Sequence, residues 1–403
     1  MSWEKVKLGD IAEFSNGVNF DKSAYAPGIK LISVSNFGNR FYPDYSELSE
    51  ISADAVKKND YLQHGDIVFV RSNGNKELVG RCMLIDNPPT HTTYSGFCIR
   101  ARVKDTTRFN PKFLTYHFKH DGFRIAMAGN AVGANIQNLS QGRLSAYIAY
   151  IPPIETQHRI ADTLSAYDDL IENNRKQIKL LEEAAQRLYK EWFVDLRFPG
   201  HEHTNIVDGV PGGWEKSTVS NISSVLRRGI SPKYNDQAEL MVINQKCIRQ
   251  TVVTFDEARK QEKPFPEEMN LQDGDTVICS TGAGTLGRVG QIFGNYPQTT
   301  FDSHVTLVRA KPDFGTQYLF HFLKSHQEYL MGMGKGSTNQ LELSRGTIQD
   351  LGILVPTKEI RKGFEMLAQS IHDKIGVANA EIRHLQNTRN RLLPKLMSGE
   401  VEI

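Results

Sequence analysis

The sequence predicts an α+β protein in which two β-rich domains alternate with two long helices that pack as an antiparallel coiled coil. Three observations lead to this prediction. The chain repeats itself in one order at an offset of about 210 residues, each copy opens with short β-like runs, and each closes on a long heptad-patterned helix. The expected β-rich domains are residues 1–150 and 201–355, and the expected helices are residues 151–200 and 356–403.

The repeat runs along the whole chain. SWEKVKLGDI (2–11) matches GWEKSTVSNI (213–222) at an offset of 211, and LQHGDIVFVRS (62–72) matches LQDGDTVICST (271–281) at 209. VGRCMLI (79–85) matches LGRVGQI (286–292) at 207, and IP (151–152) matches VP (355–356) at 204. Matches that keep one order indicate two copies of one unit, copy one and copy two, each of about 200 residues.

The first part of each copy is rich in β-like runs. DIVFV, RCMLI, TVICS and HVTLVRA are separated by clusters of Gly, Asn, Pro and Ser. This spacing is typical of a twisted, mostly antiparallel sheet or a barrel-like domain. Aromatic and leucine residues at helical spacing predict a helical insert near Pro111–Phe123 and Gln317–Tyr329.

The second part of each copy follows a 4-3 step of apolar residues. The first series is Ile160, Leu164, Tyr167, Ile171, Asn174, Ile178, Leu181, Ala185, Leu188 and Trp192. The second series is Phe364, Ala368, Ile371, Ile375, Ala378, Ile382, Leu385, Arg389, Leu392 and Leu396. Only Asn174 and Arg389 break the apolar pattern, which favours a coiled coil. Pro152-Pro153 and Pro199-Gly200 flank the first helix, and Pro394 is expected to end or kink the second.

The composition is that of a globular protein, with 39% hydrophobic and 23% charged residues. The four cysteines are scattered without a C-x-x-C pair, so buried reduced thiols are expected rather than a zinc site or a disulfide framework. The sequence lacks a leader-like start and an apolar run long enough for a membrane span, which predicts a cytoplasmic protein with no membrane partner. A net charge of +2 permits local basic patches and decides nothing further.

Two short motifs suggest enzyme chemistry and are explained better by turns. Gly282-Ala-Gly284-Thr-Leu-Gly287 matches G-x-G-x-x-G, but RVGQIFGNYPQTTF follows it, and that segment does not read as a helix. Its copy-one counterpart, RSNGNKELVGR (71–81), has lost the glycine spacing, which favours a glycine-rich hairpin tip. NPPT (87–90) resembles the N-P-P-aromatic motif of adenine methyltransferases with Thr in place of the aromatic residue, and a proline turn explains it. No other catalytic or metal-binding motif is evident, although an unfamiliar active site stays open.

Polar loops supply chemistry suited to DNA. Arg and Lys suit phosphates and guanine edges, Asn and Gln can bond adenine with two hydrogen bonds, and glycines let backbone amides approach phosphates. The candidates in copy one are Asn16, Asn19, Lys22, Asn36, Arg71, Asn73, Lys76, Arg81, Asn130, Asn135, Gln137 and Asn138. The candidates in copy two are Arg227, Arg228, Lys233, Tyr234, Lys246, Thr281, Arg288, Lys335, Ser337, Thr338, Asn339 and Gln340. Solvated loops without a ligand are the alternative for each.

The segment IPPIETQHRIADTLSAYDDLIENNRKQIKLLEEAAQRLYKEWF (151–193) resembles the central conserved region of type I restriction–modification specificity subunits, the HsdS family. The similarity lies in the P-P-x-x-x-Q-x-x-I spacing that leads into the helix, in both W-E-K starts and in the two-copy layout. The heptad pattern and this resemblance together give the candidates for the spacer and its partner contacts, which are Gln157, Ile160, Leu164, Ile171, Asn174, Ile178, Leu181, Leu188, Trp192, Ile371, Ile375, Ile382, Leu385 and Leu392. Copy two departs from the pattern, since VPTKEIRKGF lacks the second Pro and the Gln.

The resemblance implies two target-recognition domains that each read one half of a bipartite double-stranded DNA site, with the helices setting the gap. It implies a non-catalytic chain that binds no cofactor itself. Two HsdM subunits would bring S-adenosylmethionine and adenine-N6 methylation, and HsdR subunits would bring ATP- and Mg-dependent cleavage. The alternatives are a coiled-coil interaction protein with two β-rich heads and no DNA role, and a nucleotide-dependent enzyme.

Overall fold

The computed structural model describes residues 3–38, 40–75, 78–89, 91–128, 137–282, 284–334 and 341–403. The chain divides into two units, and each long helix contributes residues to both. Unit 1 comprises Met1–Glu172 and Arg383–Ile403, and unit 2 comprises Asn173–Ile382. The domain boundaries expected from the sequence remain predictions.

Unit 1 is built on two small sheets. An antiparallel sheet has the order β2 (Ala12–Asn16), β9 (Cys98–Val103), β5 (Ile67–Val70), β7 (Cys82–Leu84). A three-stranded sheet has the order β4 (Ser49–Ile51), β3 (Tyr25–Ile32), β8 (Thr92–Tyr94), with β3 and β8 parallel. Two short antiparallel pairs complete it, β1 (Glu4–Lys7) with β11 (Ile148–Ile151) and β6 (Ser72–Asn73) with β10 (Gln137–Asn138). The short helices are α1 (Leu8–Ile11), α2 (Pro111–Lys119), α3 (Asp121–Ala128) and α4 (Gln141–Ala146).

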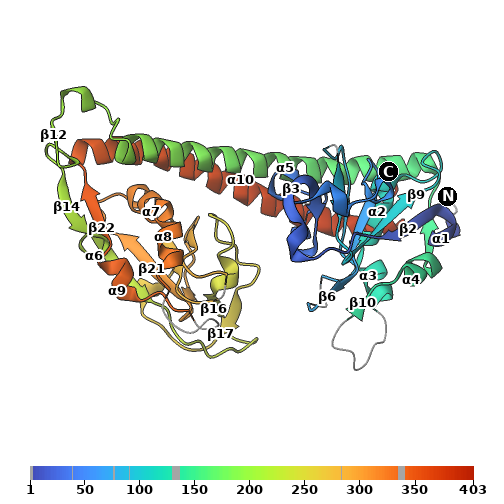
Figure 1. The fold of residues 1–403 in the computed structure, drawn as a ribbon. Coiled ribbons are helices and arrows are strands. Elements are labelled where there is room, and N and C mark those ends of the chain that lie inside the picture. Colours follow the sequence, from blue (N-terminus) through green and yellow to red (C-terminus); the bar gives the residue numbers. More distant parts are fainter. Residues whose placement is uncertain are drawn as a thin grey trace. The chain divides into compact units, whose positions relative to one another are not determined.

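Unit 2 repeats this topology. Its antiparallel sheet has the order β15 (Ser223–Arg228), β21 (Val305–Ala310), β18 (Thr276–Cys279), β19 (Val289–Gln291). Its second sheet has the order β17 (Arg259–Gln261), β16 (Leu240–Ile243), β20 (Thr299–Phe301), with β16 and β20 parallel. Two short antiparallel pairs complete it, β12 (Ile206–Val207) with β13 (Val210–Pro211) and β14 (Glu215–Thr218) with β22 (Gly352–Val355). The short helices are α6 (Val219–Ile222), α7 (Thr316–Ser325), α8 (Gln327–Gly332) and α9 (Arg345–Gln349). The same strand order in both units confirms the internal repeat. Figure 1 colours the chain along the sequence, with the strands of unit 1 in blue to cyan and those of unit 2 in green to orange.

The central strands are apolar on both faces because both faces are covered. In β5, Ile67 and Phe69 join the cluster that contains the α2 residue Phe113. Val68 and Val70 point the other way, since side chains alternate along a strand, and join the cluster that contains Ile32 of the second sheet. Strand β18 divides its side chains in the same manner between two clusters.

The long helices are α5 (Ile154–Tyr189), which continues into a π-helical segment at Lys190–Val194, and α10 (Lys358–Ser398). Pro394 lies inside α10, so the helix does not end at this proline, and the expected kink remains a prediction. Every residue of both heptad series is buried or half-buried. The two helices contact each other within each unit, through the ion pair of Asp168 and Arg389 in unit 1 and through the rings of Tyr189 and Phe364 in unit 2. Full-length coiled-coil geometry remains a prediction.

Each long helix is fastened to the β-rich domain that precedes it by contacts with backbone atoms. In α5, Nε2 of Gln157 donates to the carbonyls of Pro152 (2.9 Å) and Arg108 (3.0 Å), and Oε1 accepts from the amide of Asn110 at 2.8 Å. Asn110 in turn caps α2. The glutamine that copy two lacks is thus a joint between domain and helix.

Copy two makes the same joint with different side chains. Arg361, at an offset of 204 from Gln157, donates to the carbonyls of Pro356 (3.1 Å) and Asp313 (2.9 Å). The first residue before α7 is Gly315, which has no capping side chain, and the carboxylate of Glu365 accepts from the amides of Gln317 (2.9 Å) and Tyr318 (3.2 Å) instead. The departure in the sequence therefore leaves the joint intact.

Among the residues that the structure describes, no helix is both long and apolar enough to cross a membrane. All four cysteines are buried free thiols, in agreement with the expectation. Burial raises the pKa of Cys82 to about 11, so this thiol is unreactive at neutral pH.

Candidate nucleic-acid interface

In unit 1 the fold gathers several predicted residues around the β8–β9 turn. The amide and guanidinium of Arg71 donate to the carbonyls of Phe97 (2.8 Å) and Gly96 (3.3 Å). The side chain of Asn19 lies against Gly96, where an added Cβ would come within 2.0 Å of its oxygen. Asn16 ends the neighbouring strand opposite Ile99. The carbonyl of Arg71 also accepts from the amide of Leu139, next to the short pair β6–β10. This pair therefore places Asn73 and Asn138 at the same end of the sheet as Arg71.

In unit 2 the equivalent turn also gathers predicted residues. Oγ1 of Thr281 lies 2.6 Å from Nδ1 of His304, and Nε of Arg228 donates to the carbonyl of Ser303 at 2.7 Å. The amide of Ser280 donates to the carbonyl of His304, which repeats the Arg71–Phe97 contact of unit 1. The two turns are therefore the same feature of the fold seen twice.

Three of the basic candidates of unit 2 are paired with glutamates. Arg227 pairs with Glu268, Arg228 with Glu342 and Lys233 with Glu262. The ring of Tyr234 lies under Arg259, whose guanidinium carbon is 3.5 Å from the ring centroid. A DNA phosphate that binds these cations has to displace a carboxylate, which costs part of its binding free energy.

Other predicted residues lie apart from these turns. Lys22 and Lys246 are exposed on short 3₁₀ helices. Oδ1 of Asn36 accepts from the backbone amide of Ser33 at 2.8 Å and so stabilises its own turn. Arg81 and Arg288 are the last residues of equivalent turns. Their backbone amides donate to the carbonyls of Leu78 and Thr285.

Part of the prediction lies outside the described residues, which is why these members stay predictions. They are Lys76, Asn130, Asn135, Lys335, Ser337, Thr338, Asn339 and Gln340. For Gln137 only the backbone is described, opposite Asn73.

Sequence reasoning missed the aromatic positions of the two turns. Phe97 is 63% exposed beside Arg71, and His304 is its counterpart at an offset of 207. An exposed aromatic ring beside polar side chains suits contact with sugars or bases. The alignment of TTYSGF with TTFDSH was the available signal, since an aromatic ring follows a buried strand in both copies.

The glycine motif is a strand connection, as predicted. Strands β18 and β19 are antiparallel neighbours, and residues 284–287 form the turn between them. Gly287 has φ +75°, and a Cβ there would come within 2.5 Å of the backbone of Met331. This glycine is required by the close approach of α8, and no helix starts after it as a dinucleotide site would need.

The chain is similar to known proteins along its whole length. The sequence profile of the family described as "Type I restriction modification DNA specificity domain" matches residues 1–183 and 211–376. The MjaIX specificity subunit of Methanocaldococcus jannaschii is 25% identical over 100% of this chain and 94% of its own length. The HindI specificity subunit of Haemophilus influenzae is 24% identical over 99% of both.

A solved structure agrees at the level of the fold. The S subunit of the type I restriction–modification system of M. genitalium superposes with a TM-score of 0.55 at 16% identity, over 98% of this chain and 96% of that one. The sequence alone leaves two alternatives open, an interaction protein without a DNA role and a nucleotide-dependent enzyme. The match to the family profile does not favour either of them. The chain belongs to the family of type I restriction–modification DNA specificity domains, and its role is that of the non-catalytic specificity subunit.

Proposed function

We propose that each β-rich domain reads one half of a bipartite double-stranded DNA site and that α5 and α10 set the gap between the halves. The observation that carries this proposal is the duplicated fold. Both units present an equivalent turn with polar and aromatic side chains, at Gly96-Phe97 and at Ser303-His304. Two readers on one chain suit a site with two separate halves.

The helices have the length that a spacer needs. A helix of 36 residues such as α5 is about 54 Å long. One turn of DNA is about 34–36 Å long, so the helix spans about one and a half turns. Phosphate contacts from the basic side chains supply affinity that falls steeply with salt.

The catalytic work belongs to partner subunits in this proposal. Two methyltransferase subunits hold S-adenosylmethionine, and restriction subunits hold ATP and Mg²⁺. Large apolar side chains that face solvent on the helices of unit 2 support a protein partner there, because exposed apolar groups mark interaction sites. Leu180 is 65% exposed, Met366 72% and Val377 69%.

The test is an exchange of one reader. Residues 1–150 are replaced by the corresponding segment of another family member, and the methylated site is mapped in a host that carries the methyltransferase partner. We expect one half of the site to change while the other half and the gap persist. The reciprocal exchange of residues 205–350 serves as the matched control and changes the other half. Alteration of both halves, or of neither, by either exchange would contradict the proposal.

A further inference from the structure

Unit 1 fills the space between α2, α5 and α10 with its own side chains. The hydroxyl of Tyr116 donates to Asp168 at 2.6 Å, and Arg389 pairs with the other oxygen of the same carboxylate. The ring of Phe41 stacks on Tyr116 with 4.2 Å between the centroids. A guanidinium, a carboxylate and two aromatic rings therefore occupy one buried site.

The repeat identifies the same positions in unit 2. The segments FLTYHFK (113–119) and YLFHFLK (318–324) align Tyr116 with His321. Arg389 and Ala185 both hold the eighth place of their heptad series. The backbone amide of Leu84 donates to the carbonyl of Phe41. The amide of Gln291, the counterpart of Leu84, donates to the carbonyl of Thr251, so Thr251 is the counterpart of Phe41. All three large side chains of unit 1 have smaller counterparts in unit 2.

The missing volume appears in unit 2 as a cavity. It measures about 330 Å³ and is lined by Ala185, Thr251 and His321, the three small counterparts. Phe293, Phe320 and Ile375 give it apolar walls. Apolar pockets of about 300 Å³ with a few convergent polar groups are typical of sites for small ligands.

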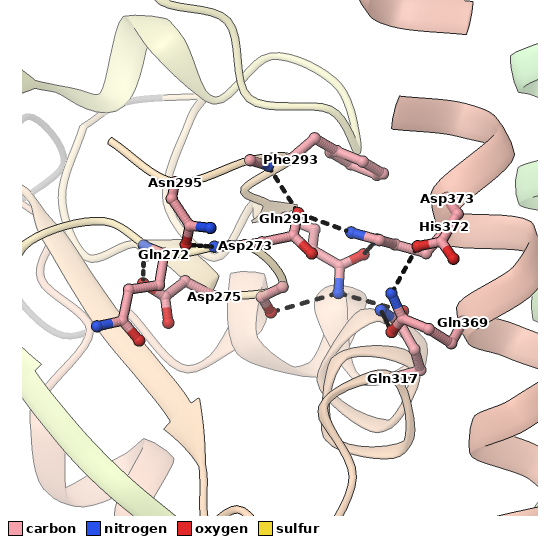
Figure 2. Close-up of polar contacts among 12 residues, drawn as sticks. Gln272, Asp273, Asp275, Gln291, Phe293, Asn295, Gln317, Gln369, His372 and Asp373 are labelled. Atoms are coloured by element: carbon pink, nitrogen blue, oxygen red, sulfur yellow. Dashed lines mark hydrogen bonds and ion pairs between the residues drawn. The ribbon is translucent and has the colours of Figure 1, made fainter. Parts of the chain in front are cut away.

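One wall of the cavity is held by a polar network (Figure 2). The ring nitrogens of His372, the counterpart of Asp168, lie 3.1 Å from Oε1 of Gln291 and 3.1 Å from Oδ1 of Asp273. The same ring stacks on Phe293 at 4.2 Å. Nε2 of Gln291 donates to Oε1 of Gln317 at 3.2 Å. This wall is fixed by hydrogen bonds and leaves the space beside it open.

The cavity also holds a carboxyl group, Glu182 of α5. Burial raises the pKa of Glu182 to about 7, since its charged form lacks solvation, and this effect outweighs the ammonium of Lys324 and the hydroxyl of Thr251, which both lower that pKa. Nδ1 of His321 lies 3.3 Å from Oε1 of Gln186, and burial lowers the pKa of this histidine to about 3, so it stays neutral. The ammonium of Lys324 donates to the carbonyl of Val289 at 3.2 Å and to Oε1 of Gln327 at 3.0 Å.

We propose that this cavity of unit 2 binds a small planar cation of the guanidinium or amidinium class, with an attached apolar or aromatic group. The cation takes the place that the guanidinium of Arg389 holds in unit 1, and Glu182 is its carboxylate partner. The attached group lies against Phe293 and Phe320, as Phe41 lies against Tyr116. A bound ligand contacts α5, α7 and α10 together and so stabilises unit 2.

Benzamidine is a suitable probe because it joins an amidinium to a phenyl ring. Calorimetric titration of the full chain at pH 7.5 should give a dissociation constant of about 1 mM or tighter for a ligand of this size. Benzamide has the same shape without the charge and should bind about tenfold more weakly. Absence of benzamidine binding, or equal binding of benzamide, would overturn the assignment.

Variants locate the site. Glu182→Gln removes the carboxylate and should weaken benzamidine binding about tenfold, whereas Glu381→Gln, on the exposed surface of α10, should leave it unchanged. Ala185→Met fills the cavity and should abolish binding, and Thr251→Phe, which installs the residue of copy one, does the same from the opposite wall. Benzamidine binding that persists in a folded cavity-filled variant would place the ligand elsewhere and refute the proposal.

Discussion

Asp168→Ala tests whether the buried charges of unit 1 depend on one another. Asp168 is 2% exposed and Arg389 is 7% exposed, so the substitution leaves a guanidinium buried without its carboxylate. Removal of one partner from a buried ion pair costs about 3–5 kcal/mol. The hydroxyl of Tyr116 also loses its acceptor. We therefore expect the free energy of unfolding of unit 1 to fall by about 3–5 kcal/mol.

The double variant Asp168→Leu/Arg389→Met separates a buried charge from a buried void. It removes both charges and keeps most of the volume, so its stability should return to within about 2 kcal/mol of the natural chain. Glu4→Ala breaks the exposed pair with Arg108 in the same unit and should cost less than about 1 kcal/mol.

Hydrogen–deuterium exchange in a urea series is the suitable assay, because peptides of unit 1 and unit 2 are followed separately and the chain need not unfold in one step. A loss for Asp168→Ala no larger than that of Glu4→Ala would refute the reasoning. So would a double variant as unstable as the single one.

Three further predictions concern pH, the spacer and the loops. The pKa of the Glu182 carboxyl is raised to about 7 in the folded chain, so the buried carboxylate destabilises unit 2 progressively as pH rises from about 4.5 to 7. Glu182→Gln should therefore stabilise unit 2 by about 1–3 kcal/mol at pH 8 and change nothing at pH 4. Urea unfolding at the two pH values measures this difference. Ile171→Asp places a charge at a buried position of α5 and should abolish methylation by the assembled complex while both β-rich domains stay folded by circular dichroism; unchanged assembly would contradict a core position. Lys335→Ala should weaken DNA binding for all sequences and lower the salt dependence, whereas Gln340→Ala should relax the preference for one base; equal effects on every sequence from both would remove the base-reading role of Gln340.

The repeat and the helices were predictable because they depend on periodic patterns. Strands such as β5 and β18 are short apolar runs that recur at a nearly constant offset, and the same sheet order follows in both units. The heptad positions are buried or half-buried as the 4-3 step requires, and the polar members Asn174 and Arg389 are buried. The pattern could not show that Arg389 meets Asp168, since that contact joins residues more than 200 positions apart.

The roles of the loop residues and the cavity could not be predicted, because they too depend on contacts between residues far apart in the sequence. Asn36 and Arg71 are both polar residues in segments that the sequence predicts as loops. The side chain of Asn36 stabilises its own turn, whereas that of Arg71 reaches the β8–β9 turn. The cavity of unit 2 is lined by three side chains from separate segments that are each smaller than their counterparts in unit 1. No single segment of the sequence carries that information.

The joints between domain and helix have a consequence for how such a protein can change over time. Gln157, Arg361 and Glu365 all bind carbonyls or amides of the main chain. Main-chain groups are the same for every amino acid, so substitutions in a β-rich domain leave the joint untouched as long as the turn before α2 or α7 keeps its path. A β-rich domain with a foreign sequence can therefore keep this joint when recombination exchanges it onto an old helix, and only side-chain contacts such as Tyr116–Asp168 have to be matched.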